Sequence, residues 1–171
     1  GGYGIPLAMK MEAVEQIGQS LLESGAGEVL IAGEGEAPLI DEFPAEWDVL
    51  LRDIPHRFVD MTHSALFPAG PAVVLIDGRL DPPASTLDLY LDAAAAASEV
   101  PLRAGEGSYF VFSLPAEARP DPDVAMDPPL LLANWVNLLG YDLPQRIEND
   151  SAVWQVHWRT GDNPDPADYQ F

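Results

Sequence analysis

The sequence predicts an α/β protein whose first part is a small three-layer α/β/α domain, Rossmann-like, with a mainly parallel sheet. Two short apolar runs, residues 28–32 and 72–78, have the length and the unbroken hydrophobicity of strands that are buried on both faces. Segments with apolar residues at helical spacing precede and separate such strands. Strands that alternate with helices of about ten residues or more imply parallel crossovers and a sheet that is covered on both sides.

The N-terminal elements alternate as this fold requires. A first helix is predicted over residues 6–24, where Pro6 suits the first turn and Gly25 the C-cap. Its apolar residues at helical spacing are Leu7, Met11, Val14, Ile17 and Leu21. After the strand at 28–32, a second helix is predicted from Pro44 until Pro55 ends it.

The remaining elements of this domain are two strands, a third helix and a hairpin. The strands are predicted at residues 57–61 and 72–78, and the helix begins near Ser85 and continues through the alanine run from Ala93 to Ala97. Residues 100–103 and 108–113 are predicted as strands joined by Gly105-Glu106-Gly107, a hairpin signal that adds an antiparallel edge. Residues 1–115 are therefore expected to form the α/β domain.

The composition changes after this domain. Residues 116–129 are rich in Pro and Asp, which is typical of a linker. Residues 130–171 are predicted to form a β-strand unit, with strands at 130–143 and 152–159 and another beginning at Asp168. Two or three strands are not a stable sandwich by themselves. We expect either the opening strands of an incomplete, truncated β-sandwich or strands that dock on the α/β domain.

The charge of the chain excludes several classes of function. Its 171 residues include 8 Lys and Arg against 28 Asp and Glu, a formal net charge of -20, and Lys10 is the sole lysine. Nucleic acids are bound through their phosphates by basic side chains, so we expect no nucleic-acid partner. The same charge opposes adsorption to anionic lipid. Because the chain has 0 Cys, it lacks thiol chemistry and cysteine-based metal sites.

No motif predicts a cofactor or a metal. Gly33-Glu34-Gly35-Glu36 resembles the start of a dinucleotide fingerprint, but the two glutamates would repel phosphates and Pro38 removes an amide donor. An acidic surface loop is the favoured interpretation. His56, Asp60 and His63 do not have the spacing of a ligand set. We therefore predict no cofactor and no metal, and no constellation indicates a catalytic residue.

Two groups of side chains are candidates for ligand binding. Glu34, Asp60 and Asp77 follow or end predicted strands, at the edge of a parallel sheet where ligands usually bind, and carboxylates there could hydrogen-bond sugar hydroxyls. The favoured alternative is that a chain with 28 acids places several at strand ends in any case.

The tryptophans of the β-strand unit form the second group: Trp135, Trp154 and Trp158. Their flat faces could stack on sugar rings. The favoured alternative is a core role, because the alternation of the strand places Trp154 and Trp158 on one apolar face.

Six segments together resemble a known family: GGYGIPLAMKMEAVEQI, VLIAGEGEAP, HRFVD, FPAGPAVVLIDG, ANWVNLLGYDLP and VHWRTGDNPDPADYQF. They are similar to the C-terminal extracytoplasmic region of bacterial multi-pass membrane glycosyltransferases, the enzymes related to dolichyl-phosphate-mannose protein mannosyltransferases and aminoarabinose transferases. In that family the membrane helices carry the polyprenyl-phosphate-sugar site, and the acidic catalytic residues lie in loops near the first helices. The resemblance therefore transfers no catalytic residue to any position of this chain.

The resemblance implies a non-catalytic domain on the extracytoplasmic face of a bacterial membrane. Its partners would be the membrane-embedded part of the same polypeptide and a glycan or protein acceptor that it helps to recognise. Two other interpretations stay open. One is a stand-alone small-molecule-binding protein or enzyme that uses Glu34, Asp60 and Asp77, and the other is a structural interaction module, which a large apolar patch beside the β-strands would favour.

Overall fold

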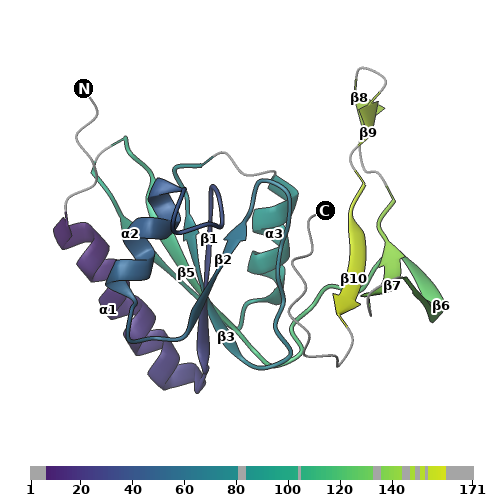
Figure 1. Cartoon of the computed structure of the whole chain (residues 1–171), viewed down its shortest axis with the longest axis horizontal. Helices are drawn as coiled ribbons and strands as arrows, with labels where there is room; N and C mark the ends of the chain where they lie inside the picture. The colour runs from purple at the N-terminus through teal and green to yellow at the C-terminus, as the bar shows by residue number, and fades with distance from the viewer. Residues whose placement is uncertain are drawn as a thin grey trace. The chain divides into compact units, whose positions relative to one another are not determined.

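The computed structural model of the chain describes residues 7–80, 84–103, 105–132, 136–143, 147–148, 151–152 and 154–160 (Figure 1). The chain divides into two compact units, Gly1–Arg119 and Pro120–Phe171. The first unit is mixed α/β, as predicted, and the second is built from β-strands. Each unit is described by itself below.

The first unit contains a five-stranded sheet in the order β2-β1-β3-β5-β4. Its strands are β1 (Glu28–Gly33), β2 (His56–Asp60), β3 (Ala72–Asp77), β4 (Ala96–Pro101) and β5 (Ser108–Leu114). β1 pairs in parallel with β2 and β3, whereas β5 pairs antiparallel with β3 and with β4. The sheet is therefore mixed rather than mainly parallel. The predicted hairpin is confirmed, but its second strand β5 lies inside the sheet, between β3 and β4.

Helices cover both faces of this sheet (Figure 1). α1 (Leu7–Ser24) and α2 (Glu42–Leu50) lie on one face, and α3 (Ala84–Ala93) lies on the other. Successive strand residues point to opposite faces. Val29 and Ile31 therefore pack against α1 and α2, while Leu30 and Ala32 belong to the core on the α3 side. Burial on both faces explains why β1 and β3 are continuous apolar runs.

The sequence prediction is also wrong at the alanine run. α3 ends at Ala93, and β4 begins at Ala96, so Ala96 and Ala97 are strand residues and not helical ones. They pair with Ser113 and Phe112 of β5. The high helix propensity of alanine is worth only a few tenths of a kcal/mol per residue over most other residues, and the backbone pairing with β5 outweighs it.

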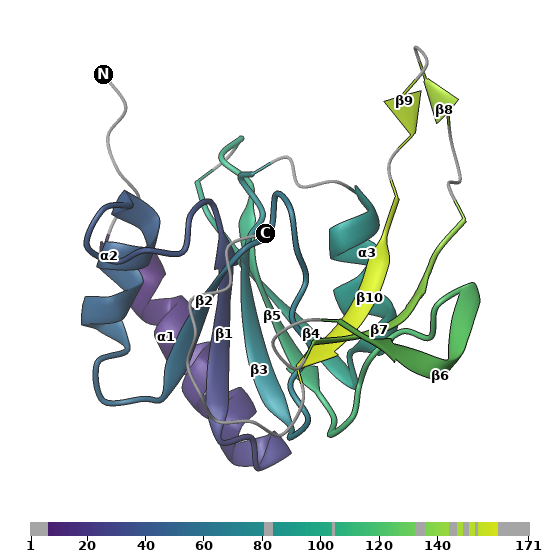
Figure 2. The ribbon, with the colours of Figure 1, turned by 45° about the vertical axis from the view of Figure 1, so that its right-hand side comes forward.

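The second unit contains a three-stranded antiparallel sheet in the order β10-β7-β6 and a short hairpin of β8 and β9 (Figure 2). The bounds are β6 (Val124–Leu131), β7 (Val136–Tyr141), β8 (Ile147–Glu148), β9 (Ser151–Ala152) and β10 (Val156–Thr160). Much of β6 falls in the stretch expected to be a linker. The pairing of β6 with β7 shifts register between Ala125 and Leu130, and Pro128 and Pro129 lie in this interval. Proline is tolerated at such a bulge and on an edge strand because no ladder hydrogen bond is needed there.

Within the described residues, none of the helices has both the length and the apolar character that crossing a lipid bilayer requires.

Candidate functional site

The carboxyl ends of three strands meet at one edge of the first unit's sheet, as the sequence predicts. Asp60 of β2 is the partner of Gly33 of β1, and Ile76 of β3 is the partner of Ala32. Asp77, one residue after Ile76, therefore lies next to Gly33 on its other side. Glu34 follows Gly33 directly and is exposed.

An aromatic ring lies over Gly33, the residue of β1 that separates two of these acids in the register. The ring of Phe43 lies directly against Gly33, so tightly that a Cβ at position 33 would clash with it. Because Gly33 lies between Asp60 and Asp77 in the register, this aromatic ring fills the space over the middle strand.

The carboxylates of Asp60 and Asp77 are also engaged locally. Asp60 accepts hydrogen bonds from the amide of Thr62 at 3.0 Å and from its hydroxyl. The carboxylate of Asp77 is almost fully buried and is clamped by Arg79, with Nε 2.9 Å from Oδ1 and Nη2 2.5 Å from Oδ2. The backbone amide of Arg79 donates a further hydrogen bond to Oδ1 at 3.0 Å. A carboxylate bound in this way is a poor acceptor for a sugar hydroxyl.

A polar cluster that the sequence did not predict lies beside Asp77 on the α1 and α2 side. Tyr109 is the partner of Asp77 in the pairing of β3 with β5. Its ring packs edge-on against Trp47 at 5.4 Å, and the guanidinium of Arg79 lies 5.9 Å from its centroid. Burial raises the pKa of the Tyr109 hydroxyl, although the positive charge of Arg79 opposes the change. The phenol is therefore neutral near pH 7 and cannot act as a base there.

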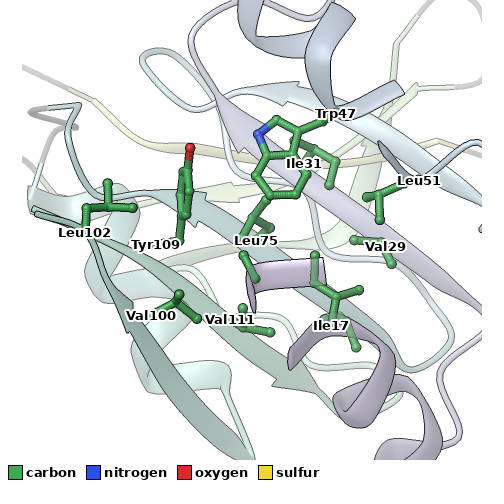
Figure 3. Close-up of a cluster of buried hydrophobic side chains, with 12 residues drawn as sticks. Ile17, Val29, Ile31, Trp47, Leu51, Leu75, Val100, Leu102, Tyr109 and Val111 are labelled. Atoms are coloured by element: carbon green, nitrogen blue, oxygen red, sulfur yellow. The ribbon is translucent and has the colours of Figure 1, made fainter. Parts of the chain in front are cut away.

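Two hydrogen-bond donors in this cluster are buried without a partner among the described residues: Nε1 of Trp47 and the hydroxyl of Tyr109. Figure 3 shows both polar atoms on the same side of the apolar cluster, away from Val111 and Ile17. Both residues are fully buried, so the structure gives no ligand a route to them. We interpret this cluster as a core feature that costs stability and not as a binding site.

Lys10 is the one sequence feature that indicates a charged contact between α1 and α2. It lies on the buried stripe of α1, with Ala13 and Ile17, and its Nζ is 2.5 Å from the carboxylate of Glu46 on α2. A lone lysine at helical spacing with core residues indicates an ion pair at the border of the core. The pair joins α1 to α2.

The second unit carries the stronger candidate for binding. In the antiparallel pairings, Trp158 faces Leu138, and Leu138 faces Leu130. Val156 faces Tyr141 in the same way, and Tyr141 faces Val124. Directly paired residues of antiparallel strands share one face of a sheet. We call this surface the aromatic face; it consists of Val124, Leu130, Leu138, Tyr141, Val156 and Trp158, together with Trp154, whose ring lies 5.7 Å from that of Tyr141.

Four residues of the aromatic face are exposed to solvent, and the other three are partly buried. Trp154 is 54% exposed and Trp158 is 44% exposed, and neither is enclosed in a core as the favoured interpretation of the sequence required. Leu130 and Val156 are similarly exposed. The third candidate tryptophan, Trp135, lies outside the described residues. Val136 is the one buried hydrophobic residue among the described residues of this unit.

A polar group joins the three strands of the sheet at one end. Oδ2 of Asp142 is 2.8 Å from Nε2 of His157, and its Oδ1 accepts the amide hydrogen of Asp123 at 3.0 Å. Asp123 in turn accepts the amide hydrogen of Leu143 at 3.0 Å. Burial alone would raise the pKa of Asp142, but the hydrogen bonds from His157 and Asp123 and the charge of His157 outweigh it and lower that pKa.

In the described part of the chain, no three His, Asp or Glu side chains are arranged to hold a metal ion. Comparison of the chain with protein-family models, with curated proteins and with solved structures returned no match.

Proposed function

We propose that this chain is a non-catalytic, extracytoplasmic domain of a bacterial membrane glycosyltransferase that uses a polyprenyl-phosphate-linked sugar. In this proposal the domain is attached to the membrane-embedded part of the same polypeptide and binds glycan through the aromatic face. Its first unit, with helices on both faces of a mixed sheet, would be a variant of the small Rossmann-like three-layer domain. The resemblance of the sequence segments supports the family, and the aromatic face supports the binding role.

The exposure of Trp154 is the observation that carries this proposal. A large aromatic side chain that is half exposed on an otherwise apolar sheet face is costly in water, because its surface orders solvent that burial would release. Trp154 and Tyr141 lie 5.7 Å apart with their planes tilted by 55°, which gives a sugar ring two aromatic surfaces to contact. The net charge of -20 favours neutral sugars over glycans that carry carboxylates or phosphates.

The local hydrogen bonds of two strand-end acids, Asp60 and Asp77, support this proposal. A small-molecule site at the sheet edge would need carboxylates that are free to bind substrate, whereas Asp77 is held by Arg79 and Asp60 by Thr62. The proposal therefore places recognition on the second unit and transfer chemistry outside this chain. A purified chain that transfers sugar from a polyprenyl-phosphate donor would contradict it.

A substitution series at Trp154 tests glycan binding. Titration of the full chain with neutral oligosaccharides of mannose, glucose and galactose, followed by calorimetry and tryptophan fluorescence, should give saturable binding to at least one of them. Trp154→Phe keeps a flat ring and should retain part of the affinity. Trp154→Leu keeps an apolar side chain without a ring and should weaken binding about tenfold or more, a loss of roughly 1.4 kcal/mol or more.

The aliphatic residues of the aromatic face favour a second candidate function, an interaction module that binds another protein. Leu130 and Val156 are exposed beside the tryptophans, and apolar contact with a protein does not need a ring. The same series separates the two functions. A flat response to every sugar, together with self-association or protein binding that Trp154→Leu keeps and Val156→Ser loses, would replace glycan recognition with this second function.

A further inference from the structure

Two adjacent aliphatic side chains project into water from a loop of the first unit. Leu39 is 99% exposed and Ile40 is 85% exposed. They belong to residues 34–41, the segment between β1 and α2, which we call the 34–41 loop. The loop follows the carboxyl end of β1, the position from which loops of α/β folds usually contact ligands and partners.

The 34–41 loop is held in place by hydrogen bonds. Oδ2 of Asp41 accepts the amide hydrogens of Glu36 at 3.1 Å and of Ala37 at 3.0 Å. The carbonyl oxygen of Ala37 accepts from the amides of Ile40 at 2.9 Å and Asp41 at 2.8 Å.

Gly35 makes this closed shape possible. Its φ is +80°, and the Asp41 side chain lies so near that a Cβ there would come within 2.5 Å of it. The loop therefore presents Leu39 and Ile40 in a defined shape, and they are not the tip of a frayed segment.

The charged residues that flank these two side chains in the sequence are acidic. Glu34, Glu36, Asp41 and Glu42 flank them in sequence, and residues 11–51 contain no Lys or Arg. Single exposed aliphatic residues are common on protein surfaces and need no explanation. Leu39 and Ile40 differ from such residues because they are adjacent, held in a defined loop and flanked only by acidic charges. A partner surface that complements them has an apolar socket with a basic rim.

We propose that the 34–41 loop is a docking element for a protein partner, with Leu39 and Ile40 entering an apolar socket rimmed by Lys or Arg. The acidic flanks orient the encounter, and the two aliphatic side chains supply the contact. A bilayer fits less well, because the flanking carboxylates would meet the anionic headgroups of a bacterial membrane. This proposal does not depend on the aromatic face or on glycan binding.

Two synthetic helical peptides of equal charge test the proposal on the full chain. One carries an apolar leucine face flanked by lysines, and in the other serines replace the leucines. Both will be attracted to a protein of charge -20, so the ratio of their affinities measures the apolar contribution alone. We expect the leucine peptide to bind more tightly, to shift the amide resonances of residues 34–42, and to lose roughly tenfold in affinity in the double variant Leu39→Ser/Ile40→Ser.

Leu22→Ser is the matched control, because Leu22 of α1 is 87% exposed and lies outside the loop. It should leave the ratio of the two affinities unchanged. Equal binding of the two peptides to the native chain would overturn the proposal, as would an unchanged ratio in the double variant or resonance shifts confined to the second unit. Vesicles of phosphatidylcholine, alone or with phosphatidylglycerol, should not bind, and binding that the double variant abolishes would replace the protein partner with a membrane.

Discussion

At the scale of single residues, two buried tyrosines show how much a hydrogen-bond partner matters. The hydroxyl of Tyr90 accepts the amide hydrogen of Leu66 at 2.9 Å and donates to the carbonyl oxygen of Leu66 at 3.4 Å, tying α3 to the loop that follows β2. The hydroxyl of Tyr109 has no such partner among the described residues. Burial raises the pKa of both phenols, that of Tyr90 to about 12.

The two tyrosines should respond in opposite ways to the loss of the hydroxyl. Tyr90→Phe leaves the Leu66 amide without its acceptor and should lower the free energy of unfolding by about 1–2 kcal/mol. Tyr109→Phe removes an unpaired polar group while its ring contact with Trp47 is kept, so the free energy of unfolding should stay the same or rise by up to about 1–2 kcal/mol. Urea unfolding of the two variants checks both signs, and an equal loss in both would show that Tyr109 has a partner.

At the scale of secondary-structure elements, Asp41 illustrates a residue that serves a loop and not the helix it precedes. It occupies the N-cap of α2, yet its side chain makes no cap hydrogen bond there and binds the amides of Glu36 and Ala37 instead. The carboxylate thus closes the 34–41 loop onto the start of α2.

Asp41→Ala should open the loop while leaving the sheet intact. The variant leaves two amide donors without their acceptor, which should lower the free energy of unfolding by about 1–2 kcal/mol. Hydrogen exchange of the Glu36 and Ala37 amides should accelerate more than that of the β3 amides. Asp53→Ala removes an exposed carboxylate outside the loop and should change neither measurement. Unchanged exchange at Glu36 in the Asp41 variant would show that the loop does not depend on this side chain.

Element positions were predictable where burial imposes a periodic pattern. The strands at β1 and β3 were found from continuous apolar runs, and α1 from its spacing. The order of the strands could not be predicted in the same way. β5 lies between β3 and β4, and its pairing with β3 joins segments that are distant in the sequence, which no local pattern indicates. The prediction for the alanines of β4 was wrong for a related reason. Whether they are helical or extended depends on their pairing with β5.

For the candidate sites, too, local patterns predicted position but not the contacts between distant residues. Alternation correctly placed Trp154 and Trp158 on one face, but whether that face is covered depends on what packs against it. The acidic loop after β1 was recognisable from Gly33-Glu34-Gly35-Glu36, whereas the exposure of Leu39 and Ile40 follows from the hydrogen bonds of Asp41. The burial of Asp77 against Arg79 could not be read from two residues that are both charged.

At the scale of the whole molecule, the two units should differ in their resistance to acid. In the second unit, the hydrogen bonds to Asp142 lower its pKa, so the ionised carboxylate stabilises the folded state above the ordinary carboxyl pKa near 4. That contribution is lost as the pH falls below about 4 through the lowered pKa. Because this unit has a single buried hydrophobic residue among its described positions, hydrophobic burial contributes little to its stability.

The acid transition can be followed separately in each unit by nuclear magnetic resonance. Amide resonances of β7 and β10 should lose their dispersion at a higher pH than those of β1 and β3. Asp142→Asn keeps the shape of the side chain and removes its titration, so the second unit of this variant should be less stable at neutral pH and less sensitive to acid. Unfolding of both units at the same pH, or unchanged acid sensitivity of the second unit in the variant, would contradict this prediction.

The inner position of β5 also sets the earliest moment at which the first unit can be finished during translation. Until the ribosome has delivered residues 108–114, β3 and β4 have no neighbour to join them, and the sheet is split by a gap one strand wide. A nascent chain that ends before Ser108 holds four of the five strands but exposes the edge of β3 that β5 will cover. An inner strand is thus the last part of the sheet to be made, and the residues before Ser108 must wait, exposed to chaperones and proteases, for the strand that closes it.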